Sequence, residues 1–154
     1  MKPPATPELK PTTHQNTGRE PYILIVDDRY SDICLLEAIL RSHGFRSYAL
    51  TDPTKVLDQC RIVQPEIILL DISMPELDGF QVCVQLKQDI ELNSIPVLFL
   101  TAMSDVSNKI RGFKAGGSDF LIKPYEPSEL IARVYTHIKL RKTQLELAHR
   151  NKQI

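Results

Sequence analysis

The sequence predicts an α/β protein in which helices cover both faces of a five-stranded parallel sheet. Five apolar runs of strand length alternate along the chain with segments whose apolar residues recur at helical spacing. Most of the runs are continuous rather than alternating, which is typical of parallel strands buried on both faces. The central run, residues 67–70, ends at Asp71. A carboxylate at the end of such a strand lies where open α/β sheets place their ligands.

Each expected element follows from its own residues. The strands are the apolar runs, in chain order residues 21–26, 45–50, 67–70, 95–100 and 120–122. The helices follow them and are expected to begin near Ser31 or Asp32, Asp52, Phe80, Ser104 or Asp105, and Pro127. Gly44 and the pair Gly116-Gly117 are expected to end helices, and Asp78 is expected to cap the helix that starts at Phe80.

The two ends of the chain differ from the region between them. Residues 1–20 contain four prolines and almost no apolar side chain, so we expect a disordered tail or linker there. The apolar seam of the last helix is formed by Ile131, Val134, Ile138, Leu145 and Ala148. Its pattern runs on to Ile154 without a glycine or proline stop. Residues 143–154 are therefore either a coiled-coil connector to a missing output domain or a frayed, solvated tail.

Composition limits the classes of protein that the chain can represent. Its 154 residues have room for one domain, and 42% hydrophobic with 25% charged residues is typical of a soluble globular protein. The formal net charge of +0 gives no electrostatic argument for nucleic acid or an acidic membrane, and no apolar run approaches the ~20 residues of a membrane span. The three widely spaced cysteines favour reduced, structural thiols and a cytoplasmic location over disulfides or a metal site.

Polar side chains stand at the ends of four of the expected strands. Asp27 and Asp28 follow the first, Asp71 the third, Thr101 the fourth and Lys123 the fifth. Because the carboxyl ends of parallel strands meet at one edge of a sheet, these side chains are expected to converge. Three carboxylates repel unless a cation lies among them, and hard oxygen ligands favour Mg²⁺ or Mn²⁺ over zinc. With a lysine and a hydroxyl nearby, the set suits a phosphoryl group on a carboxylate, an aspartyl phosphate.

The chain resembles the receiver domains of two-component response regulators, the chemotaxis receivers among them, over about residues 21–142. The matching blocks are residues 25–28, 70–79, 100–102 and 116–125. The resemblance implies a flavodoxin-like (βα)5 doubly wound fold with strand order 2-1-3-4-5, here with an extended C-terminal helix.

The resemblance also implies a role for each acidic residue. Asp71 would accept a phosphoryl group from the phosphohistidine of a sensor histidine kinase or phosphotransfer protein. Asp28, Asp71 and the main-chain carbonyl of Ser73 would bind Mg²⁺ directly, and Asp27 would act mainly through metal-bound water. Such a protein catalyses its own phosphoryl transfer and slow dephosphorylation but is not an enzyme acting on a separate substrate.

The remaining matched residues would bind and sense the phosphoryl group. Lys123 would pair with one phosphoryl oxygen and Thr101 would hydrogen-bond another. Thr101 would then move, Phe120 would turn inward, and the surface of the fourth helix, fifth strand and fifth helix would change. That surface or the last helix could join two copies in a homodimer. The bond before Pro124 is expected to be cis, and Phe120 has a second interpretation as a simple core residue.

Two other classes of function stay open from the sequence. A pseudo-receiver would use the same fold only to bind proteins, but the full set of site residues argues against it. A phosphatase of the haloacid-dehalogenase type also forms an aspartyl phosphate. Its nucleophile, however, belongs to an Asp-x-Asp motif near the first strand, whereas here the candidate follows the third strand and position 73 is serine. The residues after the last helix are too few for a DNA-binding domain, so no direct contact with nucleic acid is expected. No contact with a membrane is expected either, because the chain has no apolar run of spanning length.

Overall fold

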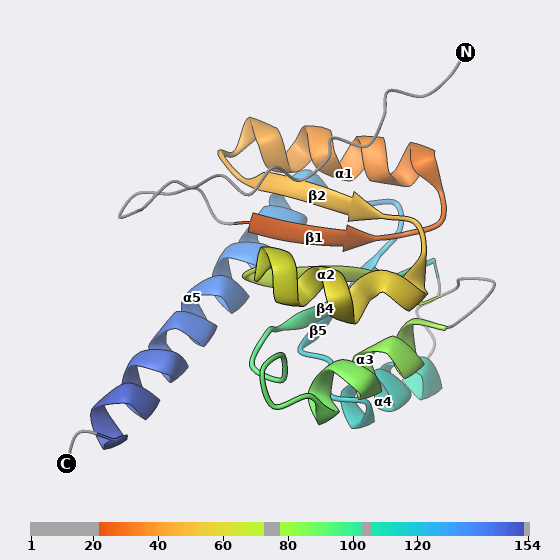
Figure 1. The fold of residues 1–154 in the computed structure, drawn as a ribbon. Coiled ribbons are helices and arrows are strands. Elements are labelled where there is room, and N and C mark those ends of the chain that lie inside the picture. The colour runs from red at the N-terminus through yellow and green to blue at the C-terminus, as the bar shows by residue number, and fades with distance from the viewer. Residues whose placement is uncertain (1–21, 73–77, 103–105, 153–154) are drawn as a thin grey trace.

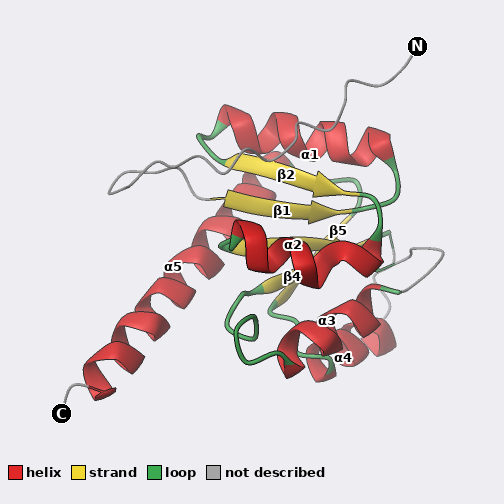
Figure 2. Ribbon diagram, in the orientation of Figure 1, coloured by secondary structure: helices red, strands yellow, loops and turns green. Residues whose placement is uncertain are grey.

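The computed structural model of the protein describes residues 22–72, 78–102 and 106–152, with side chains to residue 150. Its sheet has five parallel strands in the order β2-β1-β3-β4-β5. The strands are β1 (Tyr22–Val26), β2 (Arg46–Leu50), β3 (Ile67–Asp71), β4 (Val97–Thr101) and β5 (Asp119–Ile122). The helices are α1 (Tyr30–Ser42), the short η1 (Pro53–Lys55), α2 (Val56–Val63), α3 (Gly79–Gln88), α4 (Val106–Lys114) and α5 (Pro127–Lys152). The predicted fold class and strand order are confirmed (Figures 1 and 2).

The helices divide into two layers because successive residues of each strand point to opposite faces. On one face, Leu24, Ile68 and Phe99 pack in a core that also contains apolar residues of α2 and α3. On the other face, Ile25 and Leu69 pack in a core with residues of α1 and α5. Every residue of β3 and β4 is buried, as expected for central parallel strands. The central strands are thus fixed in register by apolar contacts on both sides.

The predicted start of α1 is wrong. The N-cap is Arg29, without a side-chain cap, and both Ser31 and Asp32 lie within the first turn. The main-chain N–H of Arg29 instead donates to Asp27 Oδ1 at 2.9 Å. The helix therefore begins at Tyr30, two residues after Asp28, and the carboxylate of Asp32 is available for a contact outside the helix.

The other helix boundaries follow local chemistry. Asp78 caps α3 as predicted, since its Oδ1 accepts from the main-chain N–H of Gln81 at 2.8 Å and the Gln81 side chain accepts from the N–H of Asp78. Gly44, with φ of +82°, follows α1 in the left-handed conformation that glycine favours. Strand β4 begins two residues later than predicted, at Val97. The residues predicted to start α4, Ser104 or Asp105, lie outside the described part.

Helix α5 extends well beyond the sheet. Leu130 and Val134 are buried against it, whereas Leu140, Leu145 and Leu147 are exposed. In Figure 1 the last turns of α5 project away from the body of the molecule. The helical extension is confirmed as far as Lys152. Whether residues 143–154 form a coiled coil stays a prediction, and the expected tail at residues 1–20 lies outside the described residues.

Close packing around Phe99 explains one glycine. The ring of Phe99 is fully buried, with its centroid 5.1 Å from that of Phe80 and 5.2 Å from that of Phe120. A Cβ atom on Gly117 would lie only 2.2 Å from Cε2 of Phe99 and 3.1 Å from the carbonyl oxygen of Gly112. The second glycine of the Gly116-Gly117 pair is thus required because the Phe99 ring leaves no room for a side chain at position 117.

We predict that Gly117→Ala lowers the free energy of unfolding by about 1–3 kcal/mol, because the buried Phe99 ring has no room to move aside. Urea unfolding followed by circular dichroism measures the change. A second substitution, Phe99→Leu, removes the clashing ring atoms and serves as the control. The double variant should lose less stability than the sum of the two single variants, and strict additivity would contradict the steric explanation.

The side chain of Asp119, the first residue of β5, contacts two residues of α5. Its carboxylate lies 2.6 Å from Arg133 Nη1 and 3.0 Å from His137 Nε2 and also accepts from the N–H of Phe120. Burial alone would raise the pKa of Asp119, but the hydrogen bonds from His137, Phe120 and Arg133 outweigh burial and leave the pKa below its usual value. The ionised form of Asp119 is therefore stabilised by folding.

We predict that Asp119→Asn costs about 1 kcal/mol of unfolding free energy at neutral pH, since partly exposed ion pairs contribute modestly. The folded-state pKa is the lower one, so the contribution is complete above the unfolded value of about 3.9 and is lost as pH falls through the folded pKa. Thermal unfolding of both proteins between pH 3 and pH 7 tests this. A stability difference that grows toward acid pH would contradict it.

Candidate functional site

Three carboxylates converge at the carboxyl edge of the sheet. Asp27 and Asp28 follow β1, Asp71 ends β3, and one carboxylate oxygen from each lies within 4.8 Å of the others. Asp27 is 0% exposed and Asp71 is 4% exposed, while Asp28 is exposed. The cluster is therefore shielded from solvent on the side of Asp27 and Asp71 and open to solvent on the side of Asp28.

The electrostatics of the cluster favour a positive charge. Burial raises the pKa of Asp27, and the charges of Asp32 and Asp28 add to this, while the hydrogen bond from Arg29 and the charge of Lys123 act in the opposite direction. Among the described residues, Asp27 Oδ2 is buried without a hydrogen-bond partner. A buried carboxylate oxygen without a donor is costly unless a cation or a water molecule satisfies it.

Lys123 is the cation that the fold supplies. Its Nζ lies 2.9 Å from Asp32 Oδ2, 3.5 Å from Asp27 Oδ2 and 3.9 Å from Asp71 Oδ1. Burial alone would lower the pKa of Lys123, but the hydrogen bond to Asp32 and the charges of Asp71 and Asp27 raise it above its usual value. Lys123 is thus held charged and within reach of the Asp71 carboxylate.

Asp32 is a site residue that the sequence analysis missed. The sequence predicts Ser31 or Asp32 as the cap of α1, but the Asp32 carboxylate accepts a hydrogen bond from Lys123, 91 positions away in the chain. The signal available in the sequence was an acidic residue in the first turn of the helix that follows the Asp27-Asp28 pair. Such a turn faces the same edge of the sheet as the strand ends.

Tyr125 is a second residue that the sequence analysis did not place in the site. Its side chain is buried, and its hydroxyl has no hydrogen-bond partner among the described residues. Burial raises its pKa, and the charges of Asp27, Asp32 and Asp71 raise it further, so the hydroxyl stays protonated. The peptide bond two residues earlier, Lys123–Pro124, is cis.

The backbone places the remaining site residues. Leu100 pairs with Asp71 across β3 and β4, so Thr101, which is 4% exposed, ends its strand beside the cluster. The N–H of Lys123 donates to the carbonyl of Thr101 at 2.7 Å. Together with the end of β1, strands β3, β4 and β5 thus bring Asp71, Thr101 and Lys123 to the same edge of the sheet as the aspartate pair, as expected. Ser73 lies outside the described residues.

Glycine is required where α3 begins. A Cβ atom on Gly79 would lie 2.4 Å from the carbonyl oxygen of Asp71, and the N–H of Gly79 donates to the carbonyl of Ile72 at 3.0 Å. The first turn of α3 therefore packs directly on the backbone of Asp71. A side chain at position 79 would displace the end of β3 or the helix.

Phe120 lies in the core of the structure. It is 6% exposed, and its ring centroid is 5.4 Å from that of Phe113 in α4. A Cβ atom on Gly112 would lie 2.3 Å from Cζ of Phe120, so the ring packs closely against the backbone of α4. This contact couples the position of Phe120 to the position of α4.

The aspartate cluster fits a hard divalent cation. Its ligand atoms are carboxylate oxygens, and two of the three residues are held by buried strand ends. The buried Asp27 Oδ2 has an ion-pair partner in Lys123 at 3.5 Å but no hydrogen-bond donor among the described residues. Oxygen-only sites with an open side suit Mg²⁺, which retains several of its waters. Carboxylates at the ends of parallel strands, a neighbouring lysine and a flavodoxin-like sheet together define the class of protein.

The chain belongs to the response regulator receiver domain family, whose model matches residues 23–135. It is therefore a receiver domain of two-component signalling. The DNA-binding response regulator MtrA of Mycolicibacterium paratuberculosis is 35% identical over 117 residues, which cover 76% of this chain and 51% of the relative. The chain thus spans about half the length of the curated relatives it matches.

Solved structures agree with this assignment. The receiver domain of a signal transduction histidine kinase from Syntrophus aciditrophicus superposes with a TM-score of 0.71 at 30% identity, covering 77% of this chain and 90% of that one. The receiver domain of the Francisella response regulator 1452 gives a TM-score of 0.71 at 29% identity, covering 78% and 98%. Receiver domains with this fold thus occur both in kinases and in response regulators.

We predict that Mg²⁺ stabilises the protein through the aspartate cluster. At a tenfold excess over its dissociation constant, a ligand of the folded state adds about 1.4 kcal/mol to the unfolding free energy. Asp27→Asn should lose most of this gain, because it removes the buried charge that faces the cation. Urea unfolding in Mg²⁺ and in a chelator measures both.

Asp58→Asn is the matched control, since Asp58 is an exposed carboxylate on α2, paired with Arg61. Its stabilisation by Mg²⁺ should equal that of the wild type. An equal loss in both variants would mean that the cation acts through general charge screening.

Proposed function

We propose that the protein accepts a phosphoryl group on Asp71 from the phosphohistidine of a sensor histidine kinase or phosphotransfer protein. The observation that carries the proposal is the position of Lys123, whose ammonium lies 3.9 Å from Asp71 and within 3.5 Å of Asp27. A charged donor held beside a nearly buried carboxylate is suited to stabilise an incoming phosphoryl group.

In the proposed reaction, a carboxylate oxygen of Asp71 attacks phosphorus. The phosphorus–nitrogen bond breaks, and its electron pair stays on the imidazole nitrogen of the donor. Lys123 exchanges part of its contact with Asp32 for a phosphoryl oxygen, and the hydroxyl of Thr101 donates to another. The backbones of these residues are held at the ends of strands, so only side-chain adjustments are needed during transfer.

Asp28, Asp71 and the main-chain carbonyl of Ser73 would bind Mg²⁺ or Mn²⁺ directly, and Asp27 would bind it through water. The bound cation supplies charge neutralisation for the carboxylates and the phosphoryl oxygens. We place both the acceptance of the phosphoryl group and its slow hydrolysis within this one site. The protein would then act on itself and not as an enzyme with a separate substrate.

The output surface is proposed to be formed by α4, β5 and α5. Movement of Thr101 toward the phosphoryl group would alter the packing of Phe120, which contacts both Phe99 of β4 and the backbone of α4. Among the described residues, the exposed large apolar side chains on these elements are Val106, Ile110, Phe113, Ile122, Tyr135, Leu140, Leu145 and Leu147. We propose this surface or the extended α5 as the contact of a homodimer.

The wider context of the receiver is also a proposal. Residues 21–142 would form the receiver, residues 1–20 a flexible tail, and residues 143–154 a connector. None of the described helices is both long and apolar enough to cross a membrane, and we propose a cytoplasmic location.

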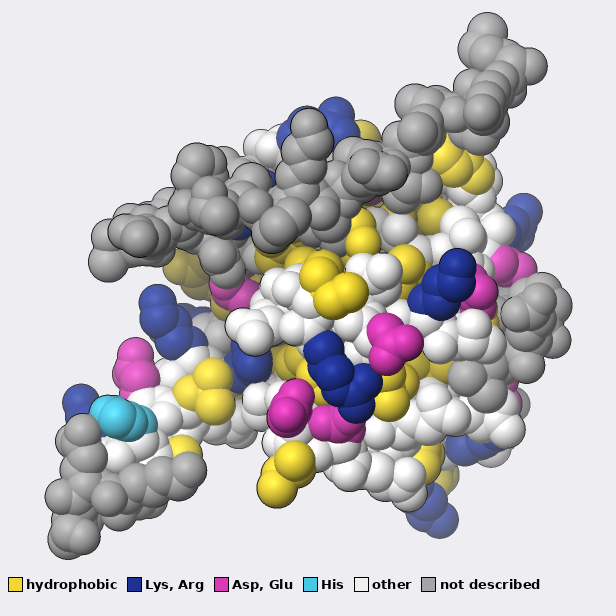
Figure 3. All heavy atoms as spheres, in the orientation of Figure 1, with side chains coloured by type: hydrophobic (Ala, Val, Ile, Leu, Met, Phe, Trp, Pro, Cys, Tyr) yellow, Lys and Arg dark blue, Asp and Glu magenta, His cyan; other side chains and the backbone are white. Residues whose placement is uncertain are grey.

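The expectation of no nucleic-acid partner is narrowed by the comparisons, because the relative MtrA is named a DNA-binding protein and is about twice as long as the aligned region. We restrict the expectation to the receiver residues. In support, the formal net charge of the whole chain is +0, and acidic and basic side chains are interspersed on the face drawn in Figure 3. Contact with DNA would then require residues beyond the receiver.

Acetyl phosphate with Mg²⁺ tests the phosphoacceptor directly. We expect intact-mass spectrometry to show one added phosphoryl group on the wild type and none on Asp71→Asn. Lys123→Ala should slow the modification by about 100-fold or more, as loss of one preorganised donor typically does. A size change on a sizing column would further support the proposed dimer contact.

A pseudo-receiver that only binds proteins is the alternative, and the same experiment separates the two. An unmodified wild type with bound Mg²⁺ would favour the binding module. Modification of both the wild type and Asp71→Asn would place the phosphoryl group on another residue.

A further inference from the structure

A second polar site lies at the opposite edge of the sheet from the aspartates. It is a hollow of about 330 Å³ between the end of α3, the segment before β4, the start of β5 and α5. Its polar lining includes Lys87, Ser94, Ser118, His137 and Arg141. The phosphoacceptor machinery contributes no residue to this lining.

Lys87 brings the first positive charge to the hollow. Its Nζ donates to the main-chain carbonyls of Asn93 at 3.1 Å and Ile95 at 2.7 Å. Among the described residues, no carboxylate forms an ion pair with it. A Cβ atom on Gly116 would lie 2.6 Å from Cγ of Lys87, so the stem of the lysine is held close over the backbone of Gly116. Burial lowers the pKa of Lys87, and the charge of Arg141 lowers it further.

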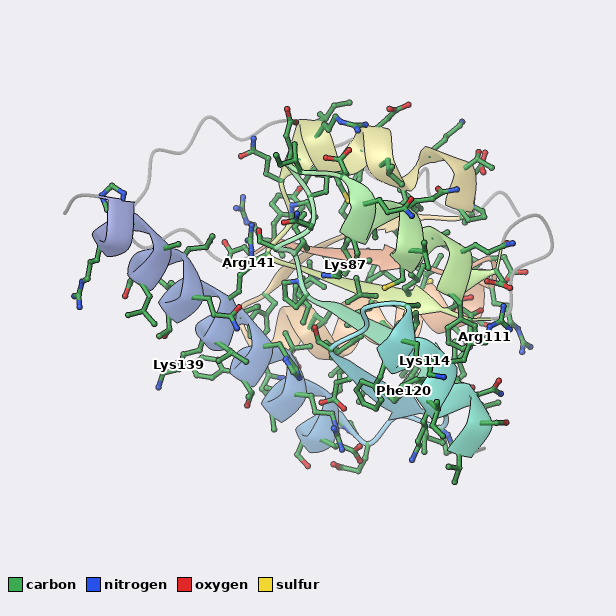
Figure 4. All side chains as sticks on the ribbon, turned by 90° about the horizontal axis from the view of Figure 1, so that it is seen from below. Lys87, Arg111, Lys114, Phe120, Lys139 and Arg141 are labelled. Atoms are coloured by element: carbon green, nitrogen blue, oxygen red, sulfur yellow. The ribbon has the colours of Figure 1, made fainter. Side chains whose placement is uncertain are left out.

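Arg141 brings the second charge. Its Nη2 donates to Ser94 Oγ at 3.3 Å, and its Nε is buried with no hydrogen-bond partner among the described residues. Burial lowers the pKa of Arg141, and the charge of Glu66 offsets this in part without coming within ion-pair distance in the described structure. Figure 4 shows Lys87 on α3 and Arg141 on α5, while Lys139 lies away from Arg141 on α5.

Among the described residues, no carboxylate lies within ion-pair distance of Lys87 or Arg141, although the charge of Glu66 acts on Arg141 from farther away. His137 lies 3.0 Å from Asp119, and Arg133 pairs with the same carboxylate at 2.6 Å. The negative charge of Asp119 is therefore already engaged by groups on α5. Two half-buried cations with an unsatisfied guanidinium N–H remain, and such a pair is stabilised by an anion.

We propose that this hollow binds the phosphate group of a small molecule, either free phosphate or a phosphomonoester. An ammonium and a guanidinium together match the charge of a dianion, and arginine presents N–H donors in the fork that suits phosphate oxygens. The hydroxyls of Ser94 and Ser118 add neutral donors. The volume is at the lower end of that of small-molecule sites, which suits a phosphate and a few further atoms.

The test is a titration of the full chain, isotope-labelled for NMR, with inorganic phosphate and separately with adenosine monophosphate. A chelator removes divalent cations, and chloride at equal ionic strength is the reference. We expect saturable shifts centred on Lys87, Ser94 and Ser118. Arg141→Gln should bind about tenfold more weakly or worse, because it removes a charge-assisted donor. Lys139→Gln, which removes an exposed charge from the same helix, should bind like the wild type.

Equal affinity for the two probes would assign the site to phosphate itself, and tighter binding of the nucleotide would assign it to a phosphomonoester. Shifts that do not saturate, that gather at the aspartate edge, or that weaken equally in both variants would overturn the proposal. The location of the shifts in the wild type decides the question even if Arg141→Gln fails to fold. Because divalent cations are absent, failure here leaves phosphorylation of Asp71 untouched.

Discussion

The contact on which the rest of the structure depends is the one between the ammonium of Lys123 and the carboxylates of Asp27, Asp32 and Asp71. Buried carboxylates without a cation would destabilise the edge of the sheet, because each loses its hydration. One lysine does not neutralise so many negative charges, and this imbalance is what makes the edge a site for a further cation. The fold tolerates it because apolar contacts on both faces of β1 and β3 fix the strand ends.

The sequence was sufficient for the fold and for the strand-end residues of the site. Asp27, Asp71 and Lys123 could be predicted because each directly follows or ends an apolar run, and a parallel sheet collects such positions at one edge. The cap of α3 could be predicted from Asp78 because capping is a contact between near neighbours in the chain. Local patterns thus sufficed wherever the relevant contact is local or is dictated by sheet topology.

Contacts between distant elements could not be read in the same way. Asp32 looks like a helix cap in sequence. In the structure, however, the Asp27 carboxylate accepts the hydrogen bond from the N–H of Arg29, and the Asp32 carboxylate accepts one from Lys123. The need for Gly117 depends on the position of the Phe99 ring, which belongs to another strand. Ser73 lies outside the described residues, so its expected role as a ligand stays a prediction. In each of these cases the deciding quantity is a distance set by tertiary packing.

Helix α3 connects the two polar edges of the sheet. Its first residue, Gly79, packs on the carbonyl of Asp71, and near its last turn Lys87 is hydrogen-bonded to the carbonyls of Asn93 and Ile95. A ten-residue helix spans about 15 Å, so α3 reaches from one polar edge of the sheet toward the other. The capping box of Asp78 and the hydrogen bonds of Lys87 thus hold α3 at its two ends, one beside Asp71 and the other beside the hollow.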